Sequence, residues 1–193
     1  MPASRPARIE GYAIISGDGM LADAAGVMPP SLKIEADQRF FHGSLDKADA
    51  VVHGRYSHEG GPNAPRRPRV IVTRRIPGVA RHPDNPKAVL WNPGGASFTE
   101  AWNMLGIGGG LLAVIGGTQI FGMFLDIGYD AFHLTRADHV RLPGGRPVFP
   151  QVPACTPEEV LRSCGYKAGP IRVLDEDKDV QLVTWIPART FPG

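Results

Sequence analysis

Features that define several specialised classes of protein are missing from this sequence. Only two cysteines occur among the 193 residues, Cys155 and Cys164, and no C-x-x-C pair is present, so neither a disulfide scaffold nor a zinc or redox motif is expected. The net charge of +2 is too small to indicate nucleic acid or a membrane surface as a partner. The histidines show no metal-ligand spacing, and His53 and His133 fall within expected strands, where we expect them buried and hydrogen-bonded. We therefore predict no metal, nucleic-acid or membrane partner.

Long apolar runs are also absent. The longest, residues 107–117, is short and interrupted by glycine, which excludes a membrane span. Residues 1–8 lack the apolar segment of a secretory signal, and we expect them to form a loose tail. A hydrophobic content of 42% with 21% charged residues is typical of a globular chain, so residues 1–193 are expected to form a single domain. These features together predict a cytoplasmic protein.

Strands and helices are expected to alternate along the chain. Short apolar runs bounded by turn residues predict strands, and Ser97 and Thr156 each begin a capping box, which predicts the start of a helix. A further helix is expected from Pro30 or Ser31 to about Leu45. The expected strands cover residues 9–15, 48–54, 69–75, 87–91, 113–115 and 129–136, followed by a closing hairpin at 171–174 and 180–186. This order predicts an α/β fold with a mainly parallel central sheet flanked by helices and an antiparallel C-terminal hairpin.

A pair of glycines, Gly116 and Gly117, separates the apolar run 113–115 from an expected helix that begins with Thr118 and Gln119. A helix that begins on a bare glycine turn leaves its first N–H groups unpaired, and together with the helix dipole these groups form an anion site. The turn is therefore a candidate for binding a phosphate of a nucleotide cofactor. A strand–helix turn that uses glycine only for close packing is the alternative interpretation of the same residues.

Basic residues follow two other expected strands. Gly54 and Arg55 end the strand at 48–54, and Arg55 at a helix start would add positive charge to a pyrophosphate site. Thr73 and Arg74 end the next strand and would offer a hydroxyl and a guanidinium fork to a 2′-phosphate. The alternatives are a solvated surface arginine in the first case and an ordinary basic strand end in the second. The carboxyl ends of parallel strands meet at the edge of the sheet where α/β proteins bind ligands.

The order and spacing of these segments resemble the dihydrofolate reductase superfamily, which includes the reductase domain of the bifunctional riboflavin-biosynthesis enzyme. The resemblance implies a dihydrofolate reductase-like fold and NADPH as the cofactor. It also implies that the cofactor contacts Ala13 on the first strand, the Gly54–Arg55 turn, Thr73 and Arg74, and the turn from Gly116 to Gln119. The matching stretches are residues 13–22, 28–32, 51–55, 70–74, 114–121, 132–136 and 148–150.

The same resemblance implies one carboxylate on the first helix, in a pocket that is otherwise apolar, where burial would raise its pKa. Counting forward from the Met-Pro motif at 28–29 gives Glu35, whereas counting back from Phe41 gives Asp37. The two carboxylates lie two positions apart and cannot share a helix face. We favour Asp37, because it lies one turn from Phe41 and because Thr135 on the adjacent strand is expected nearby. The alternative is that both carboxylates face solvent.

The substrate is expected to be a flat nitrogen heterocycle that contacts Phe41. Arg67 falls where the folate reductases hold the glutamate carboxylate of their substrate. Two departures weaken the match to folate itself, since Pro30 replaces an expected aromatic residue and no acidic residue precedes the Phe-Pro at 149–150.

The predicted function is NADPH-dependent reduction of a pterin or pyrimidine, with Asp37 or Glu35 and Thr135 in the catalytic site. A riboflavin-type reductase of 5-amino-6-ribosylaminouracil phosphate is the alternative enzyme, and a non-catalytic nucleotide-binding or oligomeric scaffold is the alternative of another class. If the edge of the closing hairpin is exposed, it could support a homodimer.

Overall fold

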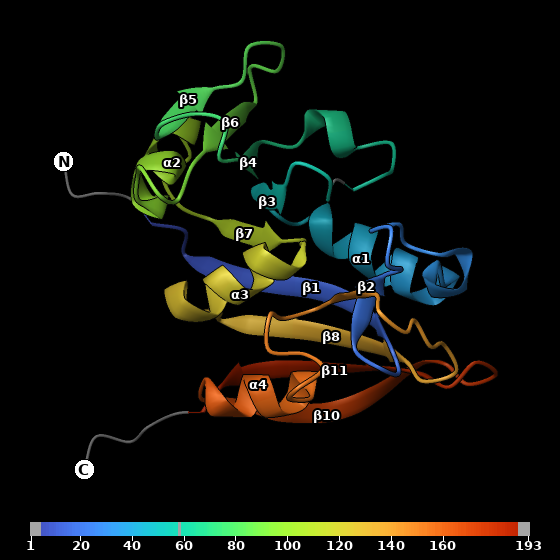
Figure 1. The fold of residues 1–193 in the computed structure, drawn as a ribbon. Coiled ribbons are helices and arrows are strands. Elements are labelled where there is room, and N and C mark those ends of the chain that lie inside the picture. Colours follow the sequence, from blue (N-terminus) through green and yellow to red (C-terminus); the bar gives the residue numbers. More distant parts are fainter. Residues whose placement is uncertain (1–4, 58, 189–193) are drawn as a thin grey trace.

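The computed structural model of the protein describes residues 5–57 and 59–188, whose fold is shown in Figure 1. A nine-stranded sheet has the order β10-β11-β8-β1-β7-β3-β4-β6-β5, and the strands from β8 to β6 in this order are parallel. These parallel strands are β1 (Arg8–Ser16), β3 (Ala50–Gly54), β4 (Arg69–Val72), β6 (Ala88–Trp91), β7 (Leu111–Val114) and β8 (Ala131–Ala137). Of the expected N-terminal tail, residues 1–4 lie outside the described residues, and Arg8 already belongs to β1.

Antiparallel strands complete both edges of the sheet. At one edge β11 (Val180–Pro187) pairs with β8 and with the outermost strand, β10 (Tyr166–Asp175). At the other edge β5 (Val79–Arg81) pairs with β6. A separate ribbon joins β2 (Met20–Ala22) to β9 (Arg146–Pro147). The mainly parallel sheet and the C-terminal hairpin are confirmed, whereas β5 was missed because three residues show no readable period.

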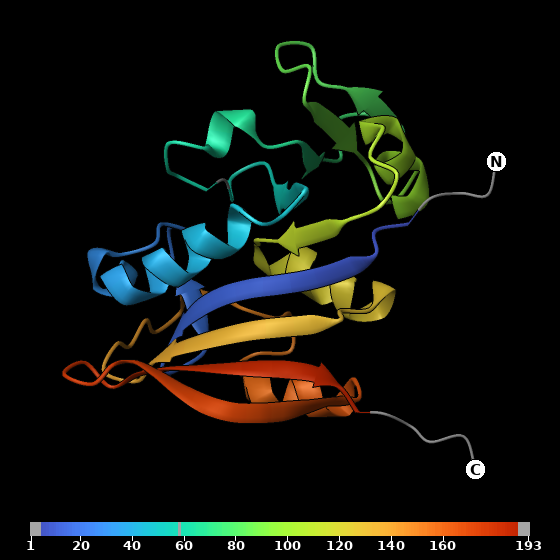
Figure 2. The same cartoon turned by 180° about the vertical axis from the view of Figure 1, so that it is seen from behind.

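Helices cover both faces of the sheet. The face that carries Ile9 and Ile15 packs against α2 (Phe98–Leu105), α3 (Thr118–Ile127) and α4 (Pro157–Ser163) in the main hydrophobic core. The opposite face carries Tyr12 and packs against α1 (Glu35–Leu45). Figure 2 shows α1 in front of the sheet, with α3 and α4 behind it. None of the described helices is long and apolar enough to cross a membrane.

Both predicted capping boxes are present. The Ser97 and Thr156 hydroxyl oxygens accept hydrogen bonds from the backbone N–H groups of Glu100 and Glu159, each at 3.2 Å. The glutamate side chains in turn accept from the backbone N–H groups of the capping residues, so α2 and α4 begin where the sequence predicts.

The helix predicted from residue 30 or 31 to Leu45 is divided in two. A short 3-10 helix, η1 (Pro30–Leu32), is followed by Lys33 and by Ile34 in extended conformation, and only then by α1. Leu32 and Ile34 are both buried in a small cluster beside Ile14. Residues two apart point the same way in extended backbone but not in a helix, so burial of both side chains explains the break.

Candidate functional site

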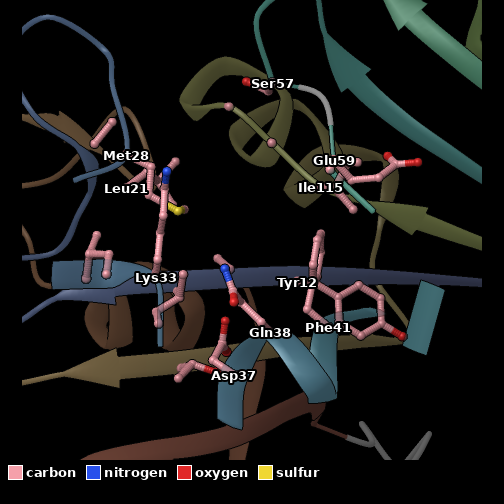
Figure 3. A pocket seen from close by; sticks show the side chains of 18 of the residues that line it. Tyr12, Leu21, Met28, Lys33, Asp37, Gln38, Phe41, Ser57, Glu59 and Ile115 are labelled. Carbon is pink, nitrogen blue, oxygen red and sulfur yellow. The ribbon is translucent and has the colours of Figure 1, made fainter. Parts of the chain in front are cut away.

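A cavity of about 510 Å³ lies between α1 and the carboxyl ends of β1, β7 and β8, and the loop that contains β2 forms one of its walls. Figure 3 shows side chains from these segments around the cavity. Six of the sequence-predicted site residues line it, namely Ala13, Asp37, Phe41, Gly116, Gly117 and Thr135. The structure therefore brings together residues that are up to 122 positions apart in the chain, from Ala13 to Thr135.

Asp37 is the carboxylate of this cavity. It lies in the first turn of α1 with 8% of its surface exposed, and the Thr135 hydroxyl on β8 donates a hydrogen bond to it. Burial raises the pKa of Asp37 to about 6, and the Thr135 hydrogen bond opposes this only in part. The side chain can therefore accept hydrogen bonds as a carboxylate or carry a proton near neutral pH.

Glu35 lies elsewhere. It is exposed at the first position of α1 and forms an ion pair with Arg39, one turn along the same helix. Glu35 does not line the cavity. Residues 35 and 37 thus occupy different faces of the helix, as their spacing predicts.

The Gly116–Gly117 turn lines the cavity together with residues of α1. Gly116 has φ +113°, a backbone conformation that favours glycine, and the Gly116–Gly117 peptide is cis. A Cβ atom at Gly117 would lie 3.1 Å from the Ser57 hydroxyl oxygen, so a side chain there would crowd the cavity wall. No side chain caps α3, which leaves the first N–H groups of this helix without a side-chain partner, as predicted.

The other predicted cofactor residues lie outside the cavity. Gly54 ends β3, and its N–H donates to the Gly116 carbonyl at 2.9 Å, which ties the two glycine turns together. Thr118 donates its hydroxyl to the Pro147 carbonyl, and Gln119 is exposed. Arg55 lies in an exposed turn over the Tyr56 ring, with no helix beginning there, which corrects the expectation that it would open a helix.

Thr73 and Arg74 lie directly after β4, at the same edge of the sheet as the glycine turns. Thr73 is buried, and its hydroxyl accepts from the Arg75 N–H at 3.2 Å. Arg74 and Arg75 are exposed. This exposed arginine pair and the uncapped N-terminus of α3 both lie at the carboxyl edge of the parallel strands.

Arg67 does not fit the role of substrate anchor. Its guanidinium is 7% exposed and forms ion pairs with Asp46 and with Glu59, the latter at 3.4 Å, while its Nε donates to the Leu45 carbonyl at 3.2 Å. The same Glu59 oxygen also accepts from Arg69 at 2.9 Å. The arginine is occupied by internal partners and does not line the cavity, so its interpretation as a substrate-binding residue is corrected.

Sequence reasoning missed a polar network under α1. The His133 ring stacks on Tyr12 at 4.7 Å between centroids and forms hydrogen bonds to Glu10 at 3.1 Å and Thr184 at 2.9 Å. The His133 hydrogen bond, with others from Tyr12 and Arg8, lowers the pKa of Glu10 to about 2 although burial opposes the shift. Tyr12 and His133 both line the cavity. The available signal for this network was the two-residue spacing of Glu10 and Tyr12, which places both side chains on the same face of β1.

Lys33 and Gln38 are among the further polar residues that line the cavity. Lys33 precedes α1 in the segment that was expected to be helical, so its direction could not be predicted from helical spacing. His53 is buried as expected, with its ring nitrogens 2.7 Å from the Gly54 carbonyl and 3.1 Å from Arg69. No cluster of three potential metal ligands occurs within residues 5–57 and 59–188.

By sequence, the chain matches no protein-family model and no curated protein. By structure, it is similar to a Shewanella sp. PV-4 protein named for riboflavin biosynthesis, with a TM-score of 0.65 and 16% identity over 94% of this chain and 99% of that one. Dihydrofolate reductase from Enterococcus faecalis, complexed with NADP(H) and RAB-propyl, gives a TM-score of 0.61 and 16% identity over 93% of this chain and 95% of that one.

A third similar structure is the Thermotoga maritima diaminohydroxyphosphoribosylaminopyrimidine deaminase/5-amino-6-(5-phosphoribosylamino)uracil reductase. The TM-score is 0.61 with 17% identity over 95% of this chain, which spans 57% of that chain. TM-scores of 0.61–0.65 over 93–95% of this chain establish a shared fold, and at identities of 16–17% they establish the fold alone. The chain therefore has the dihydrofolate reductase-like fold, as the sequence resemblance predicts.

Proposed function

We propose that the protein is an NADPH-dependent reductase of a nitrogen heterocycle, either a pterin or a pyrimidine. The observation that carries the proposal is the position of Asp37, a buried carboxylate bonded to Thr135 in a cavity that the Gly116–Gly117 turn also lines. A ring bound in this cavity would contact a hydrogen-bonding group on one edge and the cofactor site on the other.

In this proposal the side chains of α1 orient the substrate. Ring N–H groups would donate to the Asp37 carboxylate, whose position Thr135 fixes by its own hydrogen bond. The half-buried Phe41 offers an aromatic contact to the face of the ring. Because the pKa of Asp37 is raised to about 6, this residue can hold a proton beside the ring during reduction.

The residues present fit NADPH. Gly116 and Gly117 allow a close backbone approach, the N-terminus of α3 is uncapped, and Arg74 is exposed at the end of β4. Arg55 would add charge beside the phosphates, and Arg74 with Thr73 would bind the 2′-phosphate. When bound, the cofactor supplies the hydride, and the protein contributes binding, orientation and a proton.

Titration of the purified protein with NADPH and then NADH, followed by cofactor fluorescence, tests the cofactor. Pterins and pyrimidines are then screened for cofactor oxidation, with Asp37→Asn as the matched inactive variant. We expect tighter binding of NADPH than of NADH and turnover that Asp37→Asn abolishes. Cofactor binding without turnover of any heterocycle would favour a non-catalytic nucleotide-binding protein, and absence of binding would favour a scaffold.

A second proposal concerns self-association of the protein as a homodimer through β10. This strand ends the sheet and exposes Ile171 (63%) and Val173 (50%) along its length. Unpaired strand edges with apolar side chains can pair with a second copy. Size-exclusion chromatography is expected to show a dimer that Val173→Lys converts to monomer, and a monomer in the unaltered protein would overturn this proposal.

A further inference from the structure

We infer that Lys33 binds a phosphate group carried by the substrate, so that the heterocycle is held by Asp37 and its phosphorylated substituent by Lys33. The inference rests on the proposed function and specifies its substrate class. It assigns a second anchoring point to the cavity, beside the wall formed by the loop that contains β2.

The distribution of cations around the cavity is the first observation. Among the described residues, Lys33 is the only lysine or arginine that lines the cavity, and it forms no hydrogen bond or ion pair there. Two arginines of neighbouring segments are paired with carboxylates, Arg39 with Glu35 and Arg136 with Glu158. Lys33 is therefore the cation that remains available to a ligand in this cavity.

The direction of the lysine side chain is the second observation. In Figure 3 it extends away from Asp37 and Gln38 toward the wall that carries Leu21 and Met28. The pKa of Asp37 agrees with this separation, because burial raises it and only Thr135 opposes the change, with no contribution from Lys33. The carboxylate and the ammonium are thus placed to bind different parts of one ligand instead of each other.

The opposite end of the cavity offers no free cation to a ligand. Glu59 lines it there, and the carboxylate of Glu59 is fully buried and paired to Arg67 and Arg69. An acidic tail such as the glutamate of a folate would therefore find no free guanidinium at this end. Lysine acts as a point charge suited to phosphate, whereas carboxylates are bound best by a bidentate arginine, so the free lysine favours a phosphorylated substituent.

Binding of ribose 5-phosphate and ribose to the NADP⁺-saturated protein tests the inference by calorimetry, without need for turnover. The variants are Lys33→Met, Lys33→Arg and the matched control Lys47→Met, an exposed lysine that does not line the cavity. We expect Lys33→Met to weaken ribose 5-phosphate binding by about 10- to 100-fold, the loss of one charge-assisted hydrogen bond, with Lys33→Arg retaining most of the affinity. Lys47→Met should bind like the unaltered protein.

Equal binding of ribose 5-phosphate by Lys33→Met and Lys47→Met would overturn the inference. So would a loss of NADPH affinity in Lys33→Met as large as the loss for ribose 5-phosphate, because the phosphate would then belong to the cofactor.

Steady-state kinetics compare 5-amino-6-(5-phosphoribosylamino)uracil with its dephosphorylated form as substrates. We expect Lys33→Met to raise KM for the phosphorylated compound alone and to leave kcat within about twofold, the pattern of a lost binding contact. If the unaltered protein binds NADPH but reduces neither compound, the proposed function fails while the ribose 5-phosphate measurement still decides the role of Lys33.

Discussion

Two groups of arginines lie at opposite ends of β4 and have opposite environments. Before the strand and at its first residue, Arg67 and Arg69 are each 7% exposed and share the buried carboxylate of Glu59. After the strand, Arg74 and Arg75 are exposed and have no carboxylate partner among the described residues. Both groups consist of arginines, so the difference in their environments comes from the carboxylates that other segments of the chain supply.

The comparison shows how the fold separates structural cations from cations that a ligand can use. Glu59 and Asp46 hold the segment between β3 and β4 against α1 through Arg67. A buried pair of this kind adds little net stability when formed, but it is costly to break because one charge is left without a partner. The free arginines after β4 lie at the carboxyl edge of the sheet, where a ligand phosphate can replace the missing carboxylate.

The largest effect is expected from Glu59→Gln, which removes the shared partner of Arg67 and Arg69. Two buried guanidinium groups would remain with less compensation, so the free energy of unfolding should fall by about 3–5 kcal/mol. Urea unfolding of the variant and of the unaltered protein measures this difference. Asp46→Asn is the matched control, and it should have a clearly smaller effect because Asp46 is half exposed to solvent. Equal stability of Glu59→Gln and the unaltered protein would show that the arginines relax into solvent.

The same contrast explains how much could be predicted from the sequence. Local rules succeeded: both capping boxes and the Gly116–Gly117 turn follow from residues that are close together in the chain, and the alternation of strands and helices predicted the mainly parallel sheet. The choice of Asp37 over Glu35 as the buried carboxylate also follows from local helix geometry.

Predictions failed where a distant partner decides the outcome. Arg67 lies in a dense arginine segment, and nothing in that segment indicates that Glu59 and Asp46 will neutralise it. The division of the helix before α1 has the same origin, because it depends on burial of Ile34 beside Ile14. Lys33 owes its place in the cavity wall to that division, so helical spacing alone could not identify it.

Asp37 differs from the buried arginines beside Glu59, because among the described residues its only partner is the Thr135 hydroxyl and it has no oppositely charged partner. Its pKa is raised from 3.8 to about 6, so ionisation destabilises the folded state. A shift of this size corresponds to a destabilisation of at most about 3 kcal/mol, which is fully present above the folded pKa and disappears as the pH falls below the unfolded value.

Asp37→Asn should therefore raise the free energy of unfolding at pH about 8 and lose this advantage by pH about 4. The gain will be smaller than the full shift, since the introduced amide would keep only part of the hydrogen bond to Thr135. Urea unfolding across this pH range measures the difference. The control is Glu35→Gln, an exposed position where little change with pH is expected. A stability difference between Asp37→Asn and the unaltered protein that does not vary with pH would contradict the raised pKa.

The smallest change in free energy is expected from Arg74→Ala, which tests the exposed side of the comparison. Because Arg74 has no carboxylate partner among the described residues, its removal should change the stability of the fold by less than about 0.5 kcal/mol. It should weaken NADPH binding by about 10- to 30-fold, the loss of one charge-assisted contact to the 2′-phosphate, and leave NADH binding unchanged. Arg81→Ala is the matched control. Arg81 is also exposed, but in the sheet its backbone pairs with Val89, near the end of β6 that lies farther from Arg74. If Arg74→Ala and Arg81→Ala bind both cofactors equally well, the free arginines after β4 serve solubility and not cofactor selection.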